Sequence, residues 1–363
     1  MRALFFLLMT LPAFAADHLV FIGTYTRTTS QGIYAVRLDA ATGALTAPVL
    51  AAATPNPSFL ALSPGQEYLY ASSESAAMAV AFATDLEHGT LRSLQTPQSS
   101  GGAAPCHLAV DPTGRALLVA NYHAGIVAAI PLRPDGTLGV PNVIPHSGHS
   151  VDPVRQTSPH AHCVTLSPDG RFVLVCDLGL DRIFTYRLDA ARAVLAPATP
   201  PFAATAPGAG PRHLAFGADG RHAYAITEMG NTVVACDYAA DTGALTPRQA
   251  LSTLPPDFKG ASTGAEIQLH PNGRFLYASN RGHDSIAVFA VDTAGGLTPV
   301  EVTPCGGKNP RSFSLSPDGA WLVCANQNSD SLAVFRVDGR TGRLSPTGHI
   351  AHVPLPVCVL FAR

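Results

Sequence analysis

Histidines that could carry acid–base chemistry form a closely spaced pair near the middle of this 363-residue chain. His160 and His162 are one residue apart, so on an extended strand both imidazoles would project from the same face. The pair could bind a metal ion or transfer protons, but no acidic residue is fixed nearby in sequence as a third ligand. We therefore expect no metal ion and interpret the pair as acid–base or oxyanion-binding groups, with a structural role as the alternative.

Two arginines and two glutamates follow in later segments of the chain. The guanidinium groups of Arg212 and Arg281 could converge on an anionic group of a substrate. A carboxylate near two guanidiniums tends to stay ionised, so Glu228 or Glu266 would suit a base or a hydrogen-bond acceptor better than a proton donor. The alternatives are a solvated surface charge for each arginine and a structural salt bridge for each glutamate.

A recurring hairpin positions these residues. One copy turns at Ser167-Pro168-Asp169-Gly170, where proline and glycine occupy the positions that a type I turn prefers. The equivalent turn positions are 46–56 residues apart and lie at Pro64, Pro112, Pro168, Ala218, Pro271 and Pro317. Four β-type runs per repeat of this length predict an all-β fold, a β-propeller with four antiparallel strands in each blade.

The two ends of the chain resemble complementary parts of one repeat. Residues 19–26 look like a second strand with no first strand before it, and residues 356–361 look like a first strand with nothing after it. We therefore expect six complete repeats plus one composite blade, which makes seven. Pairing the two ends would hide the strand edges that an open ring exposes.

The hairpin also predicts where a ligand would bind. The start of its first strand and the end of its second lie together, and they ring one mouth of the channel if the first strand lines that channel. The first strands supply Asn56, His107, His160, His162, Arg212, His213, Glu266 and Arg311 there, and the second strands Glu74, Asn121, His123, Asp177, Glu228, Asn280, Arg281 and Asn326. The other end repeats a Ser-Pro-Asp-Gly turn, so we expect a small-molecule site at the varied mouth. Alternatively, the recurring Asn121, Asn280 and Asn326 hydrogen-bond backbone groups between blades.

The first 16 residues differ from the repeats. Arg2 precedes an apolar run that ends in Ala13-Phe14-Ala15, which is typical of a secretory signal cleaved near Ala15 or Ala16. Residues 17–363 would then form one periplasmic or secreted propeller domain. The net charge of −2 and the absence of a later membrane-spanning run argue against nucleic acid or a membrane as partner, and we expect a monomer.

Seven cysteines leave at least one thiol unpaired, and their spacing matches no zinc or redox motif. Cys163 and Cys176 are nearly symmetric about the turn at Asp169-Gly170, so we expect them to face one another. Bridging neighbouring strands demands a specific geometry, and we predict no disulfide there.

Several segments together resemble a known family. The most specific are Pro-His-Ala-His at 159–162, Asp-Leu-Gly-Leu-Asp-Arg-Ile at 177–183, Gly-Pro-Arg-His at 210–213 and Ser-Asn-Arg-Gly-His-Asp-Ser-Ile at 279–286. On these residues the chain resembles the seven-bladed β-propeller lactonases, which include 6-phosphogluconolactonases and carboxy-cis,cis-muconate cyclases. The cyclase branch uses a histidine, two arginines and a glutamate, which the resemblance places on His162 (or His160), Arg212, Arg281 and Glu228.

The resemblance and the mouth residues together predict an exported lactonase that needs neither metal nor cofactor. Arg212 and Arg281 would bind the substrate and its oxyanion, while His162 and Glu228 would manage protons. Substrate contacts are expected from His160, His107, Asn121, His123, His213 and Glu266. The substrate would be a small sugar-type or carboxylated lactone. A lactonizing cyclase and a non-catalytic binding propeller are the alternatives.

Overall fold

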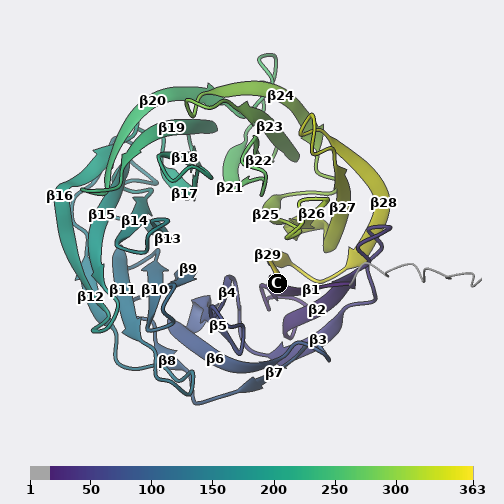
Figure 1. Cartoon of the computed structure of the whole chain (residues 1–363), viewed down its shortest axis with the longest axis horizontal. Coiled ribbons are helices and arrows are strands. Elements are labelled where there is room, and N and C mark those ends of the chain that lie inside the picture. Colours follow the sequence, from purple (N-terminus) through teal and green to yellow (C-terminus); the bar gives the residue numbers. More distant parts are fainter. Residues whose placement is uncertain (1–16, 363) are drawn as a thin grey trace, which may run out of the picture.

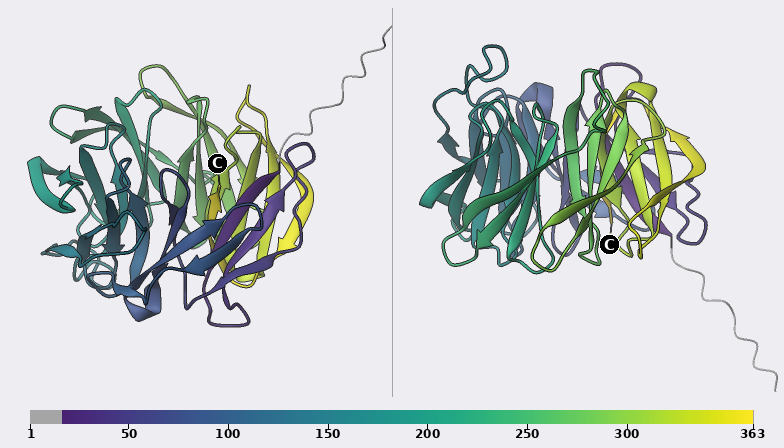
Figure 2. Two further views of the ribbon diagram at one scale, coloured as in Figure 1. Left: turned by 60° about the horizontal axis from the view of Figure 1, so that its bottom comes forward. Right: turned by 90° about the horizontal axis from the view of Figure 1, so that it is seen from above.

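Seven antiparallel sheets stand in a ring around a central channel (Figure 1), and the expected seven-bladed β-propeller is confirmed. The computed structural model describes residues 17–362, so the predicted export signal lies outside the described residues. In six sheets four strands follow one another in sequence order from the channel outward, and in the seventh the innermost strand comes from the C-terminus. One sheet carries an additional short strand, β8 (Gln98–Ser99). The side views in Figure 2 show the loops gathered at the two faces of the ring.

The strands fall into four concentric layers. The innermost strands are β4 (Leu60–Leu62), β9 (Pro105–Val110), β13 (Ala161–Leu166), β17 (Pro211–Phe216), β21 (Thr263–Leu269), β25 (Pro310–Leu315) and β29 (Pro356–Phe361). The second strands are β1 (His18–Thr24), β5 (Tyr68–Ser73), β10 (Ala116–Asn121), β14 (Phe172–Asp177), β18 (His222–Thr227), β22 (Phe275–Arg281) and β26 (Trp321–Asn326). The third strands are β2 (Gly32–Leu38), β6 (Met78–Asp85), β11 (Ile126–Pro131), β15 (Arg182–Asp189), β19 (Thr232–Ala239), β23 (Ser285–Val291) and β27 (Ser331–Val337). The outer strands are β3 (Val49–Ala53), β7 (Thr90–Ser93), β12 (Asn142–Pro145), β16 (Val194–Ala204), β20 (Ala244–Ser252), β24 (Leu297–Pro304) and β28 (Leu344–His352).

Burial follows from this layering. The second strands β10, β14 and β26 are buried at every residue because both faces of their sheets pack on neighbouring blades. The outer strand β16 is exposed at most positions. Each apolar cluster is shared by two blades, as where Phe172 and Leu174 of β14 pack with Leu214 of β17 and Ala225 of β18. The core is therefore a ring of contacts between blades.

The hairpin turns form as the sequence predicts. In the copy at Ser167, the Gly170 N–H donates to the Ser167 carbonyl oxygen over 2.8 Å, and the Ser167 hydroxyl contacts Asp169 at 2.6 Å. Gly170 has a φ of 70°, in the left-handed region where glycine is favoured. These turns lie at the end of the hairpins away from the candidate mouth.

The termini close the ring as expected. Strand β29 pairs with β1, so the composite blade has the order β29-β1-β2-β3. Trp321 of the last repeat donates a hydrogen bond from Nε1 to the Ala40 carbonyl oxygen over 3.1 Å. Its ring lies so close to Gly43 that a Cβ there would be 2.5 Å away. The composite blade is therefore held both by strand pairing and by this indole.

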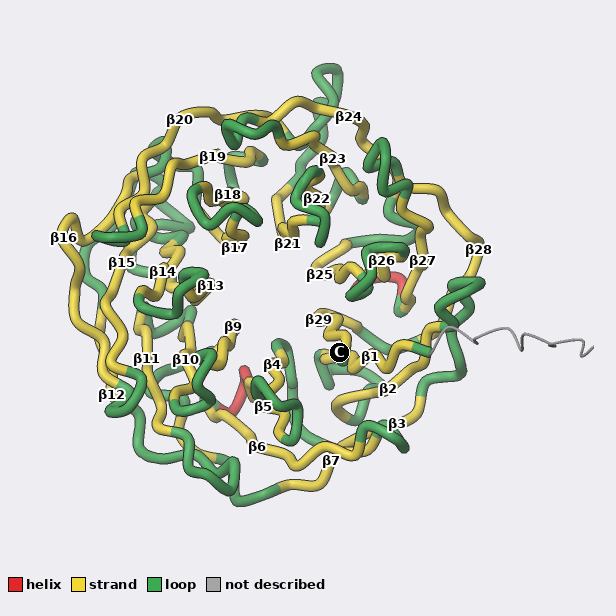
Figure 3. Tube along the Cα trace, viewed as in Figure 1, coloured by secondary structure: helices red, strands yellow, loops and turns green. Residues whose placement is uncertain are grey.

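Helical structure in the described residues consists of two short 3₁₀ turns, η1 (Glu74–Ala76) and η2 (Gln327–Ser329) (Figure 3). No helix within residues 17–362 is long and apolar enough to cross a membrane. All seven cysteines are buried, and none forms a disulfide. Cys163 and Cys176 are direct partners across β13 and β14, which confirms that they face one another.

Candidate active site

A shift in strand register marks the start of the inner strand in six of the seven blades. The residues inserted at the shift include His162 on β13, Arg212 on β17, Glu266 on β21 and Arg311 on β25. A bulge of this kind bends the strand and changes the direction of the side chain at that position. The blades thereby bring these four side chains close to one another within the channel.

Glu228, directly after β18, is the centre of the resulting charge cluster. Its carboxylate lies 3.1 Å from Nε of Arg212, 2.8 Å from Nη2 of Arg281 and 2.7 Å from Nη2 of Arg155. Burial alone would raise its pKa, but the charges of Arg281, Arg212 and Arg155 outweigh burial and lower the pKa to about 2. Glu228 is therefore ionised at every physiological pH.

A glycine lets two blades approach closely enough to build this cluster. The Gly264 N–H at the start of β21 donates to the Glu228 carbonyl oxygen over 2.9 Å, and a Cβ on Gly264 would lie 2.5 Å from the Thr227 carbonyl oxygen. The Gly264 carbonyl oxygen in turn accepts a hydrogen bond from Nη2 of Arg281 over 3.0 Å. A larger residue here would push Arg281 away from Glu228.

Arg311 is a fourth guanidinium beside the same mouth. No hydrogen bond or ion pair within residues 17–362 uses its guanidinium, which lies 5.5 Å from the ring centre of Tyr25. The Tyr25 hydroxyl donates to the Glu74 carboxylate over 3.1 Å. With Arg155, Arg212 and Arg281, the mouth thus holds four arginines against Glu228 and Glu74, and it carries a net positive charge.

A second layer of ionisable groups lies deeper in the channel. Nδ1 of His213 lies 3.1 Å from Oε1 of Glu266. The ring of His213 packs edge-on against that of His107, with the ring centres 5.0 Å apart. His107 also stacks on Phe59, with the two ring centres 3.9 Å apart. Burial raises the pKa of Glu266 to about 7, although Arg212 and His107 act against burial. This carboxyl group therefore titrates near neutral pH, unlike Glu228.

His162 lies between the two layers. The centre of its ring is 5.2 Å from that of His213 and 5.5 Å from that of Tyr122. The ring of His160 stacks on Tyr122, with the two ring centres 4.5 Å apart. Burial and the nearby charge of Arg212 lower the pKa of His162 well below its ordinary value, so the imidazole is neutral. Its Nδ1 atom is buried and has no hydrogen-bond partner within residues 17–362. His162 is thus a neutral imidazole whose Nδ1 is not committed to any neighbour in the described part of the chain.

Two of the expected substrate contacts lie apart from these layers. Asn121 is fully buried between blades, where its side-chain amide bonds the Ser100 hydroxyl at 2.8 Å and the Ser100 carbonyl oxygen at 3.1 Å. Asn280 makes the corresponding contacts with Thr253. The structural interpretation of the recurring asparagines fits this geometry better than substrate binding does. His123 is exposed at the rim, 5.3 Å from Tyr122.

Sequence reasoning missed Arg155 and Tyr122. Arg155 lies in the loop between β12 and β13 and contacts both Glu228 and the Tyr122 hydroxyl, the latter over 3.2 Å. This loop has no counterpart in the repeat pattern, but it falls in the longest interval between turns, the 56 residues from Pro112 to Pro168. The additional length was the available signal.

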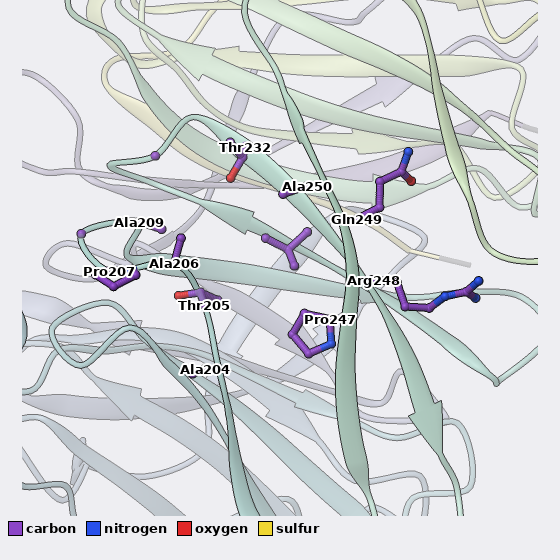
Figure 4. Close-up of a pocket in the computed structure, with 13 residues that line it drawn as sticks. Ala204, Thr205, Ala206, Pro207, Ala209, Thr232, Pro247, Arg248, Gln249 and Ala250 are labelled. Atoms are coloured by element: carbon purple, nitrogen blue, oxygen red, sulfur yellow. The ribbon is translucent and has the colours of Figure 1, made fainter.

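Two other features bear on where a ligand could bind. A hollow of about 520 Å³ lies at the outer strands β16 and β20 (Figure 4), lined by alanines, prolines and threonines and by Arg248, which pairs with Asp237. It lacks the convergent ionisable groups of the mouth. Within residues 17–362, no three histidine, cysteine, aspartate or glutamate side chains are grouped so that they could hold a metal ion.

Comparisons with known proteins agree with this fold. The family described as "Lactonase, 7-bladed beta-propeller" matches residues 19–361. The chain is 37% identical over 345 residues to a 6-phosphogluconolactonase of Bacillus subtilis. The aligned region covers 94% of this chain and 97% of that protein.

Solved structures of similar proteins have the same fold. A periplasmic gluconolactonase of Pseudomonas aeruginosa superposes with a TM-score of 0.90 and 35% identity, covering 96% of this chain and 99% of that one. A putative 6-phosphogluconolactonase of Bacteroides fragilis gives a TM-score of 0.90 and 36% identity, covering 96% and 98%.

Proposed function

Because the chain belongs to the seven-bladed β-propeller lactonase family and is a lactone hydrolase, we propose that its arginine-lined mouth hydrolyses a small, sugar-type or carboxylated lactone. The observation that carries this proposal is that Arg155, Arg212 and Arg281 share the single carboxylate of Glu228. One negative charge cannot neutralise three positive ones. The surplus charge is available to a substrate anion or to an anion that develops during the reaction.

Arg212 and Arg281 stabilise the oxyanion. Water attacks the lactone carbonyl carbon, the ring C–O bond breaks, and the products are a hydroxy carboxylate and one proton. Negative charge develops on the carbonyl oxygen and is stabilised by guanidinium groups that are already oriented. The hydrogen bonds of Arg212 to Glu228 and to the Ala265 carbonyl oxygen use Nε and Nη1, which leaves its Nη2 for the substrate.

His162 is the group that accepts a proton from the attacking water. We assign its own proton to Nδ1, which leaves Nε2 as the acceptor, and the same nitrogen then returns the proton to the leaving alkoxide. The ionised Glu228, bound by three arginines, has too low a pKa to act as this base. Its role is to hold the arginines in place.

The location and the substrate follow from the N-terminal pattern and from the relatives. The signal-like pattern of residues 1–16 indicates export, and a similar protein is named a periplasmic gluconolactonase. Phosphorylated sugar lactones are cytosolic metabolites, so an exported enzyme would act on an unphosphorylated sugar lactone. The enzyme would act as a monomer without metal, nucleic acid or membrane.

Proton release in weak buffer tests this function. The substrates are unphosphorylated and phosphorylated aldonolactones and muconolactones, with and without chelator. We expect release from an unphosphorylated sugar lactone that chelator does not affect and that Arg212→Ala abolishes. The matched control is Arg343→Ala, which removes an exposed arginine paired with Glu301 on the outer strands.

Other outcomes would redirect the assignment. Formation of an unsaturated acid in place of a hydroxy acid would show a cyclase. Absence of turnover with every lactone, together with a stoichiometric exported partner in a pull-down, would show a binding propeller.

A further inference from the structure

The deeper layer of ionisable groups has no role in the hydrolysis described above, yet it touches both Arg212 and a large cavity. That cavity, of about 940 Å³, occupies the half of the channel that opens at the turn end, and Glu266 and His107 are among its lining residues. Water can therefore reach the inner layer from the face opposite the arginine-rich mouth. Glu266 can exchange protons without their passing the positive charges of the mouth.

A chain of hydrogen bonds connects this carboxylate to the mouth. Nη1 of Arg212 lies 3.3 Å from Nε2 of His213, and Nδ1 of His213 lies 3.1 Å from Oε1 of Glu266. Because a guanidinium group can only donate, the contact with Arg212 exists only while Nε2 accepts, that is, while the single imidazole proton is on Nδ1. That N–H then donates to Glu266, which must be an acceptor.

We propose that Glu266 is a positioning residue that fixes the tautomer of His213 and thereby holds the guanidinium of Arg212 in its working orientation. This inference rests on the proposed function of Arg212 in lactone hydrolysis. Sequence reasoning expected Glu266 and His213 to contact the substrate. In the structure they are on the inner side of Arg212, and they act through it.

Protonation of Glu266 allows this chain to reverse. A protonated carboxyl group can donate to Nδ1 in place of accepting from it, and the imidazole proton would then be on Nε2, where it opposes the N–H groups of Arg212. The groups facing Glu266 come from four strands: Arg212 and His213 on β17, His107 on β9, Arg311 on β25 and Cys358 on β29. Burial of the carboxyl among them raises its pKa to about 7, so the reversal falls near neutral pH.

The pH profile of Glu266→Gln tests the proposal. In the wild type, kcat should rise about ten-fold from pH 6 to pH 8 as Glu266 ionises. A glutamine accepts from Nδ1 through its amide oxygen at every pH, so the variant should keep a flat profile across this range. The control Glu301→Gln, which removes a carboxylate on the outer strand β24, should keep the wild-type rise.

A spectroscopic measurement makes the test independent of activity. The ¹⁵N shifts of His213, assigned by their loss in His213→Gln, should show the proton on Nδ1 in the wild type at pH 8. In Glu266→Leu, which removes the acceptor, the proton should move toward Nε2; if this variant does not fold, the wild type at pH 5.5 gives the same comparison. An unchanged tautomer, or a Glu266→Gln variant that keeps the rise from pH 6 to pH 8, would overturn the proposal. If no lactone is hydrolysed, the proposed function fails and the tautomer alone decides this inference.

Discussion

Two buried glutamates from neighbouring blades have opposite protonation behaviour. Glu228 at the mouth is within 3.1 Å of three guanidinium groups, and its pKa is about 2. Glu266, deeper in the channel, contacts one imidazole and one backbone N–H, and its pKa is about 7. Both are at most 7% exposed, so burial does not distinguish them. What differs is the number of positive charges in direct contact.

This difference separates two tasks within one channel. A carboxylate that never loses its charge can hold arginines in place for an oxyanion, whereas one that titrates near neutral pH can make the site sensitive to its surroundings. Pairs of titratable groups whose neighbours push their pKa values apart are a general mark of an active site. The predictions below test whether each glutamate does only its own task.

Among these variants, Glu228→Gln should have the largest effect on the free energy of unfolding. It leaves three buried or half-buried arginines without their shared partner, which should lower the free energy of unfolding by about 3–5 kcal/mol at pH 7. Because the folded-state pKa lies below the ordinary value of 4.5, this deficit should shrink as the pH falls from about 4.5 toward about 2. Urea unfolding at pH 7 and pH 3 measures it, and an equal deficit at both pH values would contradict the ionised state of Glu228.

Glu266→Gln should raise the stability of the protein relative to the wild type, whereas Glu228→Gln lowers it. A folded-state pKa of about 7 against an ordinary 4.5 means that the wild type loses up to about 3 kcal/mol of stability as the pH rises through this interval. The glutamine variant has no such loss, so its stability relative to the wild type should increase between pH 4.5 and pH 8. A relative stability that stays constant across this interval would show that Glu266 has an ordinary pKa.

Arg155→Ala should have the smallest effect. Its side chain is 40% exposed and comes from a loop, so its ion pair should contribute at most about 1 kcal/mol to folding. As a substrate contact it should raise KM about ten-fold and leave kcat nearly unchanged. The control is Arg248→Ala on the outer strand β20. If kcat falls by a larger factor than KM rises, Arg155 instead belongs among the groups that act on the transition state.

The fold and the position of the site could be predicted because both depend on local patterns. The Ser-Pro-Asp-Gly turns mark each hairpin, and the hairpin predicts which residues share a mouth. Among the residues predicted there, Arg212 and Arg281 both contact Glu228. The complementary ends of the chain predicted the composite blade in the same way. None of this required knowledge of packing between blades.

What could not be predicted depends on contacts between blades. A register shift inserts a residue that simple alternation of side chains does not show, as at Arg212. Arg155 approaches Glu228 from a loop outside the repeat. Glu228 and Glu266 look equivalent in sequence, since each comes from a blade that also supplies a candidate arginine. Their different pKa values depend on contacts that include side chains outside their own blades.

The hydrolysis rate of Arg281→Ala tests the central claim most directly. Arg281 contributes one of the two guanidinium groups assigned to the oxyanion, and it can be removed while Arg155 and Arg212 still pair with Glu228. We predict that kcat for the best lactone substrate falls by about 10²–10³ in a variant whose circular dichroism remains that of the wild type. Full hydrolysis by this variant would contradict the assignment of the mouth as the active site.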